Sequence, residues 1–136
     1  MKEELKKVDD FLKESKVYYL LTSDRDNKPH GRPWNLYFIE GDKLYIGTGN
    51  YKGCYREIKE NPYIQILASC GNKFMRINAR AIEECNTAFV KKALDGNPSL
   101  KKMFNEETGN QMIIFRIWDA DCEVINGVVR DDHFWF

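Results

Sequence analysis

Apolar residues recur at helical spacing near the start of the chain, between charged residues. The apolar positions are Leu5, Val8, Phe11 and Leu12. One apolar stripe on an otherwise charged segment is typical of an amphipathic helix that packs against another part of the protein. We therefore expect a short helix here that lies on the rest of the fold.

Short apolar runs separated by turn-forming residues make up much of the remaining chain. Runs of this kind, rich in β-branched and aromatic residues, predict strands. They cover residues 17–22, 29–39, 44–46, 63–68, 74–82, 111–118 and 122–125. Asn126-Gly127 is the strongest hairpin signal in the chain. Because most connections are short, we expect neighbouring strands to run antiparallel.

A few helices interrupt the strands. One is predicted to run through Ile58 and stop before Asn61-Pro62, and two short pieces lie between residues 86 and 104, the second starting near Pro98. Helices do not alternate regularly with strands, which favours a mainly β fold with peripheral helices. We expect a closed or partly closed antiparallel barrel of about six or seven strands. The apolar tail, residues 133–136, is expected to dock on the barrel or on a second subunit.

Composition narrows the class of protein. The chain has 136 residues, which suits a single domain over residues 1–136. Lysine and arginine number 21 against 21 aspartate and glutamate, so no global positive field exists to recruit nucleic acid or an acidic membrane. The charged first residues and the absence of a long apolar run predict a cytoplasmic protein with no membrane span.

The four cysteines are Cys54, Cys70, Cys85 and Cys122. They are widely spaced, with no Cys-x-x-Cys pair and no histidine nearby, so we expect no metal site. Reduced, mostly structural thiols are favoured over a disulfide framework, because the chain lacks a secretory signal. Cys54 lies near a helix start, where a thiol can become reactive, but no histidine partner is apparent, which favours a structural role.

Glycines and small polar residues connect a strand to a helix between residues 48 and 56. Backbone N–H groups at such a helix start lack partners and bind anions readily. Lys52 and Arg56 oppose the helix dipole unless an anion lies nearby, so a phosphate would account for them. The alternative is a solvated loop with surface basic residues, and a short glycine-containing loop alone does not decide between the two.

Arg32 lies in a strand that otherwise resembles core. Pro33 removes a ladder donor there and suggests an edge or a bulge, where side chains can be redirected toward a ligand. Strict alternation places Arg32 on the same face as Trp34, where an unpaired charge is costly and needs an anionic partner. The competing interpretation is an arginine at the strand end whose guanidinium reaches solvent.

The order and spacing of these segments resemble the pyridoxamine 5'-phosphate oxidase-like family of FMN-binding split barrels over nearly the whole chain. The matching segments are the N-terminal helix, Arg32-Pro33-Trp34, residues 44–48, residues 58–62 and residues 73–77. The resemblance implies an antiparallel split β-barrel that binds FMN at the interface of a homodimer and acts on a small molecule. It also implies an oxidoreductase in which the flavin performs the redox chemistry.

The resemblance also implies the cofactor-binding residues. Arg32 contacts the FMN phosphate, the backbone of Pro33, Trp34 and Asn35 borders the isoalloxazine ring, and Lys73 presents a polar side chain to the flavin. Phosphate and ribityl groups are held by Thr48, Gly49, Asn50, Tyr51 and Lys52. No catalytic acid or base stands out, because the two histidines, His30 and His133, are isolated in the sequence.

The chain departs from the family's enzymes that make pyridoxal phosphate. Gly53-Cys54 stands where they have two consecutive basic residues, and Arg130 and His133 only loosely replace their arginine pair near the C-terminus. The departure argues against vitamin B6 oxidation and leaves FMN binding as the prediction. The alternatives are a non-enzymatic flavin-binding or electron-carrier protein and a family member that uses a deazaflavin or haem.

Overall fold

The computed structural model describes residues 1–136 and contains four helices and a sheet of eight strands. The helices are α1 (Glu3–Ser15), α2 (Gly53–Glu60), α3 (Thr87–Asp95) and α4 (Pro98–Met103). The strands are β1 (Tyr18–Ser23), β2 (Pro29–Trp34), β3 (Tyr37–Glu40), β4 (Lys43–Gly49), β5 (Tyr63–Cys70), β6 (Lys73–Glu83), β7 (Met112–Asn126) and β8 (Val129–Trp135). Every strand pair is antiparallel, which confirms the predicted mainly β fold with peripheral helices.

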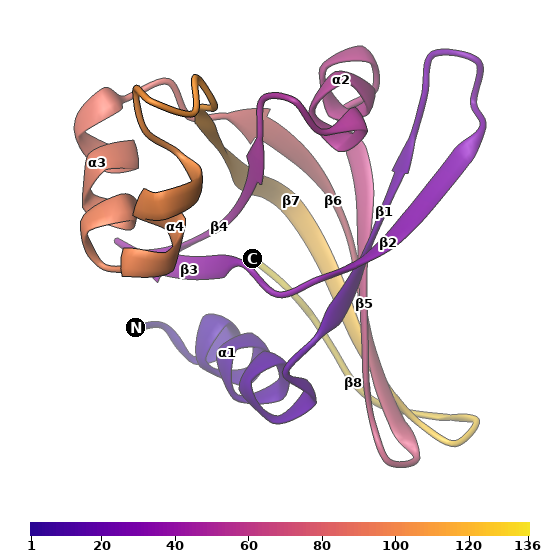
Figure 1. Ribbon diagram of the computed structural model, residues 1–136. Coiled ribbons are helices and arrows are strands. Elements are labelled where there is room, and N and C mark those ends of the chain that lie inside the picture. Colours follow the sequence, from indigo (N-terminus) through magenta and orange to yellow (C-terminus); the bar gives the residue numbers. More distant parts are fainter.

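The sheet curls into a split barrel (Figure 1). Its strand order is β2-β1-β5-β6-β7-β4-β3, and β8 pairs with β7 outside this path. The long strand β7 pairs with β4 near its start and with β8 near its end, while β6 runs along its other side. Strand β7 therefore joins the two parts of the sheet.

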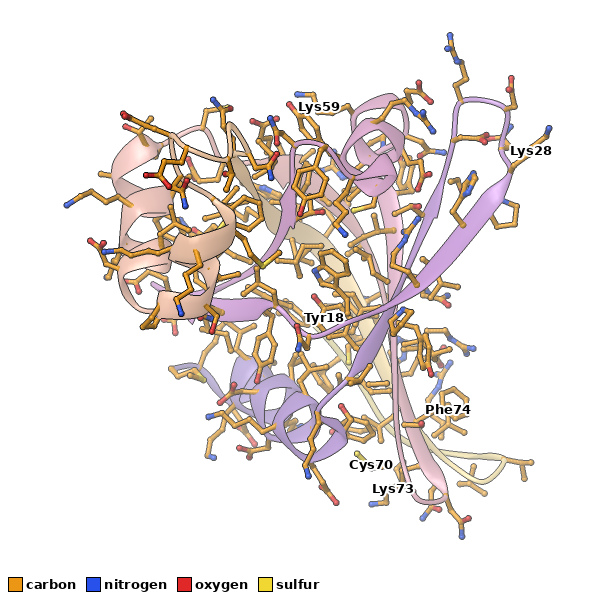
Figure 2. All side chains as sticks on the ribbon, viewed as in Figure 1. Tyr18, Lys28, Lys59, Cys70, Lys73 and Phe74 are labelled. Atoms are coloured by element: carbon orange, nitrogen blue, oxygen red, sulfur yellow. The ribbon has the colours of Figure 1, made fainter.

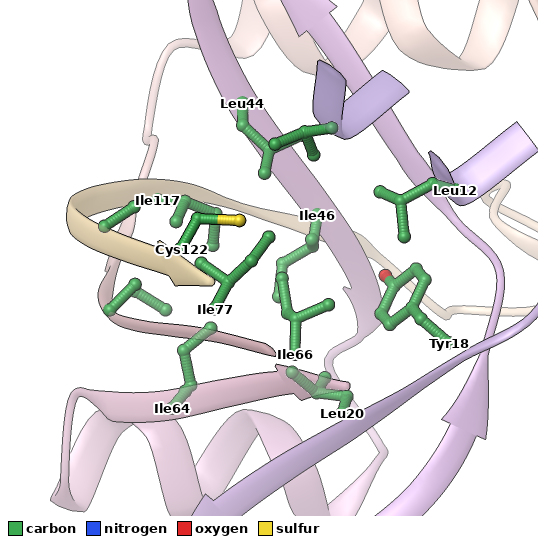
Figure 3. Close-up of a cluster of buried hydrophobic side chains, with 14 of the residues drawn as sticks. Leu12, Tyr18, Leu20, Leu44, Ile46, Ile64, Ile66, Ile77, Ile117 and Cys122 are labelled. Atoms are coloured by element: carbon green, nitrogen blue, oxygen red, sulfur yellow. The ribbon is translucent and has the colours of Figure 1, made fainter. Parts of the chain in front are cut away.

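Alternate residues of the strands point into the barrel and form one core with α1. Leu5, Val8 and Leu12 of α1 are buried, because they form the apolar stripe that the helical spacing indicated. Figure 3 shows this cluster, in which strand residues from across the sheet meet Leu12 and Tyr18. A second, smaller cluster lies under α3 and α4 around Tyr45, Phe104, Met112 and Ile114. This smaller cluster adjoins the candidate site.

The stretch predicted as one strand over residues 29–39 is two strands on opposite edges of the sheet. Strand β2 pairs with β1, and β3 pairs with β4. Asn35 and Leu36 lie between them, outside any strand. The Tyr18 hydroxyl donates to the Leu36 carbonyl over 2.7 Å, which gives this backbone carbonyl a donor partner outside the strand ladder. Simple alternation along the sequence does not reveal such a break.

The two strands predicted over residues 111–118 and 122–125 form the single strand β7, which begins one residue later, at Met112. The turn-like residues between them form an irregularity instead, with Asp119 at a φ of 51° and a register shift opposite Asn78 and Arg80. The hairpin predicted at Asn126-Gly127 is confirmed, and it adds β8, which explains the total of eight strands. Phe134 of the tail is buried in the core, which confirms docking on the barrel.

The helices fall where the sequence placed them. Helix α2 ends at Glu60 before Asn61-Pro62, and α4 has its proline in the first turn. The Asn86 side chain caps α3 by accepting from the backbone N–H of Ala88. None of the helices has the length and apolar character that crossing a membrane requires.

Candidate functional site

A cavity of about 370 Å³ opens between the β2–β3 connection, the end of β4 and helix α4. We call it the Trp34 pocket. Its lining residues are Val17, Pro33, Trp34, Asn35, Leu36, Thr48, Gly49, Tyr51, Lys52, Leu100, Met103 and Phe104. Most of the residues predicted to bind a cofactor, from two separate segments of the chain, are therefore brought together in one cavity. Its size lies within the usual range for small-molecule sites, about 300–1,000 Å³.

Trp34 joins the two predicted segments. Its indole nitrogen donates a hydrogen bond of 2.7 Å to the carbonyl oxygen of Gly47 on β4. Together with the bond from Tyr18 to Leu36, this fixes the irregular connection between β2 and β3 against the rest of the barrel. A half-buried tryptophan held at its polar end presents an apolar ring surface in a fixed position. The pocket therefore has a rigid aromatic wall.

Gly49 allows two aromatic rings to pack closely against the backbone at the other end of the pocket. A Cβ atom at this position would lie 2.6 Å from a ring carbon of Tyr51 and 3.1 Å from a ring carbon of Phe104. The centroids of those two rings are 6.4 Å apart. Any side chain at residue 49 would push the rings outward, so the shape of the pocket depends on glycine here.

The start of α2 lies beside this cavity. No side chain caps the helix, and its first turn holds no acidic residue. Lys52, at the N-cap, forms no ion pair, and its Nζ lies 5.3 Å from the centre of the Tyr51 ring. No carboxylate lines the pocket. An uncapped helix N-terminus and an unpaired lysine in an acid-free pocket fit an anionic ligand.

Cys54 lies behind this loop and takes the structural role predicted for it. The thiol is buried and donates to the Thr48 hydroxyl over 3.4 Å. Burial raises the pKa of the Cys54 thiol above its ordinary value, although the Thr48 hydrogen bond acts in the opposite direction. A thiol with a raised pKa is a poor nucleophile at neutral pH. Its burial and its hydrogen bond to Thr48 therefore fit a packing role for Cys54.

Arg32 has the anionic partner that its position required, and the partner is a side chain of α2. Nη2 of Arg32 donates to Oε1 of Glu57 over 2.7 Å, and Nη1 donates to the Leu20 carbonyl and the Thr22 hydroxyl over 3.2 and 3.0 Å. The Thr22 hydroxyl in turn donates to Glu57 over 2.7 Å. His30 lies 3.6 Å from the other oxygen of Glu57. We call Thr22, His30, Arg32 and Glu57 the Arg32–Glu57 cluster.

Hydrogen bonds of the cluster lower the pKa values of Glu57 and of the neighbouring Asp24. Burial alone would raise the pKa of Glu57, but hydrogen bonds from Thr22 and Arg32 and the charge of Arg32 bring it below its ordinary value. A hydrogen bond with His30, assisted by the backbone N–H of Lys28, lowers the pKa of Asp24 to about 2. His30 is thus bonded to Asp24 and close to Glu57, so the histidine is part of a charge network rather than isolated.

Three predicted residues lie outside the Trp34 pocket. Arg32 is in the cluster just described. Asn50 accepts from the Gln111 backbone N–H and donates its own N–H to the Gln111 carbonyl, so it ties the loop to the start of β7. Lys73 lies at the tip of the β5–β6 hairpin, far from α2 (Figure 2), with its Nζ 3.5 Å from Asp131. Within one subunit, Lys73 and the Trp34 pocket are not brought together.

Some residues of the site were not predicted. Leu100, Met103 and Phe104 were expected only as apolar helix positions, and the sequence does not indicate which cavity they face. Glu57 was missed because it stands among charged neighbours, Arg56, Lys59 and Glu60, which resemble a solvated helix face. The helical spacing of Cys54 and Ile58, both buried, was the available signal, since it places Glu57 beside an inward stripe.

The fold and the site together define the class of protein. It is an antiparallel split barrel with an aromatic pocket beside a helix N-terminus. The family model of pyridoxamine 5'-phosphate oxidase matches residues 5–125. The chain therefore belongs to that family, as the resemblance of its sequence indicated. No curated protein matches the chain.

Solved structures of similar fold carry differing descriptions. A NimC/NimA family protein from Clostridium acetobutylicum superposes with a TM-score of 0.84 and 26% identity, covering 96% of this chain and 91% of that chain. General stress protein 26 from Bacillus anthracis str. Sterne gives 0.72 and 18%, covering 99% and 100%. HutZ, a heme storage protein from Vibrio cholerae, gives 0.61 and 13%, covering 83% and 87%. The fold is thus shared by proteins described by different functions.

Proposed function

We propose that the protein binds FMN in the Trp34 pocket and acts as a flavin-dependent oxidoreductase on a small molecule in the cytoplasm. The observation that carries this proposal is the convergence of residues 33–35 and residues 48, 49, 51 and 52 on one aromatic, acid-free cavity. Lys52, Thr48 and the start of α2 would hold the phosphate, and Arg32 would add positive charge behind them. Trp34 and its neighbours would border the isoalloxazine ring. Bound flavin would supply hydride or single-electron transfer.

The residues of the pocket fit a flavin better than a haem. Haem iron needs an axial ligand such as histidine or cysteine thiolate. Neither residue type lines the Trp34 pocket. His30 is bonded to Asp24 and His133 to Asp121, so both histidines already have partners elsewhere. The haem and deazaflavin alternatives are tested by the visible absorption spectrum of the protein loaded with each cofactor.

The pocket offers groups that would bind and orient a ligand. Its titratable side chains are Tyr51 and Lys52, at the end beside α2. The chain therefore contributes positive charge and an apolar ring wall, and protons exchanged with a reduced flavin would come from solvent or from the substrate. Turnover of a reduced nicotinamide or a nitro compound separates an enzyme from a non-enzymatic flavin carrier.

Replacement of Lys52 by alanine tests the phosphate end of the pocket. A hydrogen bond to a charged group contributes about 1.5–3 kcal/mol, so FMN binding should weaken about ten- to a hundredfold, while riboflavin, which lacks the phosphate, should bind as before. Titration of both flavins by fluorescence quenching measures the difference. Lys28→Ala, which removes an equal charge from the β1–β2 turn, is the matched control. Equal losses for both flavins, or none, would contradict the proposal.

We also propose a homodimer with the flavin between two subunits. Lys73 is remote from the Trp34 pocket of its own chain, so the flavin contact proposed for it requires a second copy. The sheet face away from the core offers apolar surface for such a contact, with Tyr19, Tyr63, Trp118 and Trp135 all exposed. Paired copies would share one face through two-fold symmetry. Light scattering at micromolar concentration should give twice the monomer mass, and a flavin-loaded monomer would overturn this proposal.

A further inference from the structure

We propose that Glu57 is a positioning residue that holds Arg32 in place for the flavin phosphate. This inference rests on the proposed function and assigns a role to a buried carboxylate that the function did not require. Three observations support this role. Glu57 binds one edge of the Arg32 guanidinium, its carboxylate lies near the start of α2, and basic groups surround it.

The Arg32–Glu57 cluster uses only part of the guanidinium. Nη1 and Nη2 donate to Leu20, Thr22 and Glu57, whereas Nε makes no hydrogen bond. A guanidinium carries five N–H donors, so donors remain for another acceptor while the existing bonds persist. Arg32 keeps 22% of its side chain exposed, against 6% for Glu57. The carboxylate is thus the fixed partner, and Arg32 retains access to a ligand.

The carboxylate of Glu57 lies beside the first turn of α2. A Cβ atom built on Gly53 would be 3.5 Å from Oε2 of Glu57, so the side chain folds back toward the helix start. Arg32 comes from β2, and its bond to Glu57 brings its guanidinium to the same end of the helix. Without that bond, nothing except Leu20 and Thr22 would hold the guanidinium near the proposed phosphate site.

Basic groups from three directions face Glu57. Arg32 lies 2.7 Å away, His30 3.6 Å and Arg56 4.0 Å. A carboxylate surrounded in this way orders its neighbours, and it also offsets part of their charge. These two effects act oppositely on a bound phosphate. If Glu57 mainly orients Arg32, its loss weakens phosphate binding. If Glu57 mainly neutralises positive charge, its loss strengthens phosphate binding.

Two substitutions separate the effects. Glu57→Gln keeps an oxygen that accepts from Arg32 and Thr22 but removes the charge, while Glu57→Leu removes both. We expect Glu57→Leu to weaken FMN binding about five- to tenfold with riboflavin binding unchanged, and Glu57→Gln to restore FMN binding to the wild-type level or above it. Thr22→Val removes one bond from each partner and should weaken FMN binding about two- to fivefold, again without an effect on riboflavin.

Affinities for both flavins are measured by fluorescence quenching, with thermal unfolding followed for each variant. Wild-type or tighter FMN binding by Glu57→Leu, or parallel losses of FMN and riboflavin, would overturn the positioning role. If Glu57→Leu does not fold, Thr22→Val decides by the same criterion. The Lys52→Ala variant separates the two proposals. If Lys52→Ala weakens binding of FMN but not of riboflavin, and the Glu57 and Thr22 variants show no such difference, only the positioning role fails.

Discussion

Replacement of Arg32 by methionine is expected to lower the free energy of unfolding by about 3–5 kcal/mol at neutral pH. The substitution leaves Glu57, whose side chain is only 6% exposed, as a buried charge without its closest partner. Breaking a buried ion pair costs more than the pair contributes, because the remaining charge keeps its desolvation penalty. Urea unfolding monitored by tryptophan fluorescence measures the loss.

Two further variants control this result. Arg25→Met removes another arginine from the β1–β2 hairpin. Arg25 pairs with Glu60 of α2, but this pair is a surface contact of 3.8 Å, and the Arg25 side chain is 77% exposed. Its loss should cost less than about 1 kcal/mol. The double variant Arg32→Met with Glu57→Leu should recover most of the stability, since no buried charge then remains. An Arg32→Met variant as stable as Arg25→Met would show that Glu57 has access to solvent or to another partner.

The loss should also depend on pH. In the wild type, the folded-state pKa of Glu57 lies below its ordinary value, so the ionised carboxylate stabilises the fold above about pH 4.3, and this stability is lost as pH falls through the folded-state pKa. Without the hydrogen bond and the charge of Arg32, we expect the pKa of Glu57 to rise, because burial acts in that direction. The difference between wild type and Arg32→Met should therefore be largest near neutral pH and shrink toward pH 4, and a constant difference would contradict this assignment.

Replacement of Ile77 by alanine is expected to destabilise the fold by about 2–5 kcal/mol, toward the upper end of that range. Ile77 is fully buried in the middle of β6 and lies opposite Ile66 on β5 and Cys122 on β7 (Figure 3). Strands on both sides prevent the site from collapsing, so the cavity persists. Urea unfolding with an unchanged m-value would show that the native state alone is affected.

Ile82→Ala on the same strand is the matched control. Ile82 is 41% exposed, so its truncation opens no cavity and should cost less than about 1 kcal/mol. A similar loss at both positions would mean that β-propensity, rather than packing in the barrel, determines the effect at Ile77.

Local signals were sufficient to predict most of the fold. Asn126-Gly127, Asn61-Pro62 and the spacing of Leu5, Val8 and Leu12 each determine conformation through neighbours in sequence. The division of residues 29–39 was missed because its cause is not local. Trp34 bonds to Gly47 and Tyr18 to Leu36, and such long-range hydrogen bonds leave no periodic trace in the sequence.

The site was predicted in outline for a different reason. Residues 33–35 and 48–52 stand out because proline, glycine and unpaired basic residues are unusual at those places. The third wall, from α4, carries ordinary apolar residues, so Leu100 and Phe104 could not be distinguished from core. The sequence indicated that Arg32 needs an anion, but it could not show that Glu57, 25 residues later, supplies one.

The place of β7 between β6 and β4 has a consequence for synthesis of the protein. Until β7 leaves the ribosome, no strand pairing can join β2-β1-β5-β6 to the hairpin β3-β4, because β7 is the strand that lies between them in the sheet. Trp34 belongs to one piece, and Thr48 and Gly49 belong to the other. Before β7 is made, the two walls are connected only through the chain itself and through contacts such as the Trp34–Gly47 hydrogen bond, so we expect stable capture of a cofactor to follow synthesis of most of the protein.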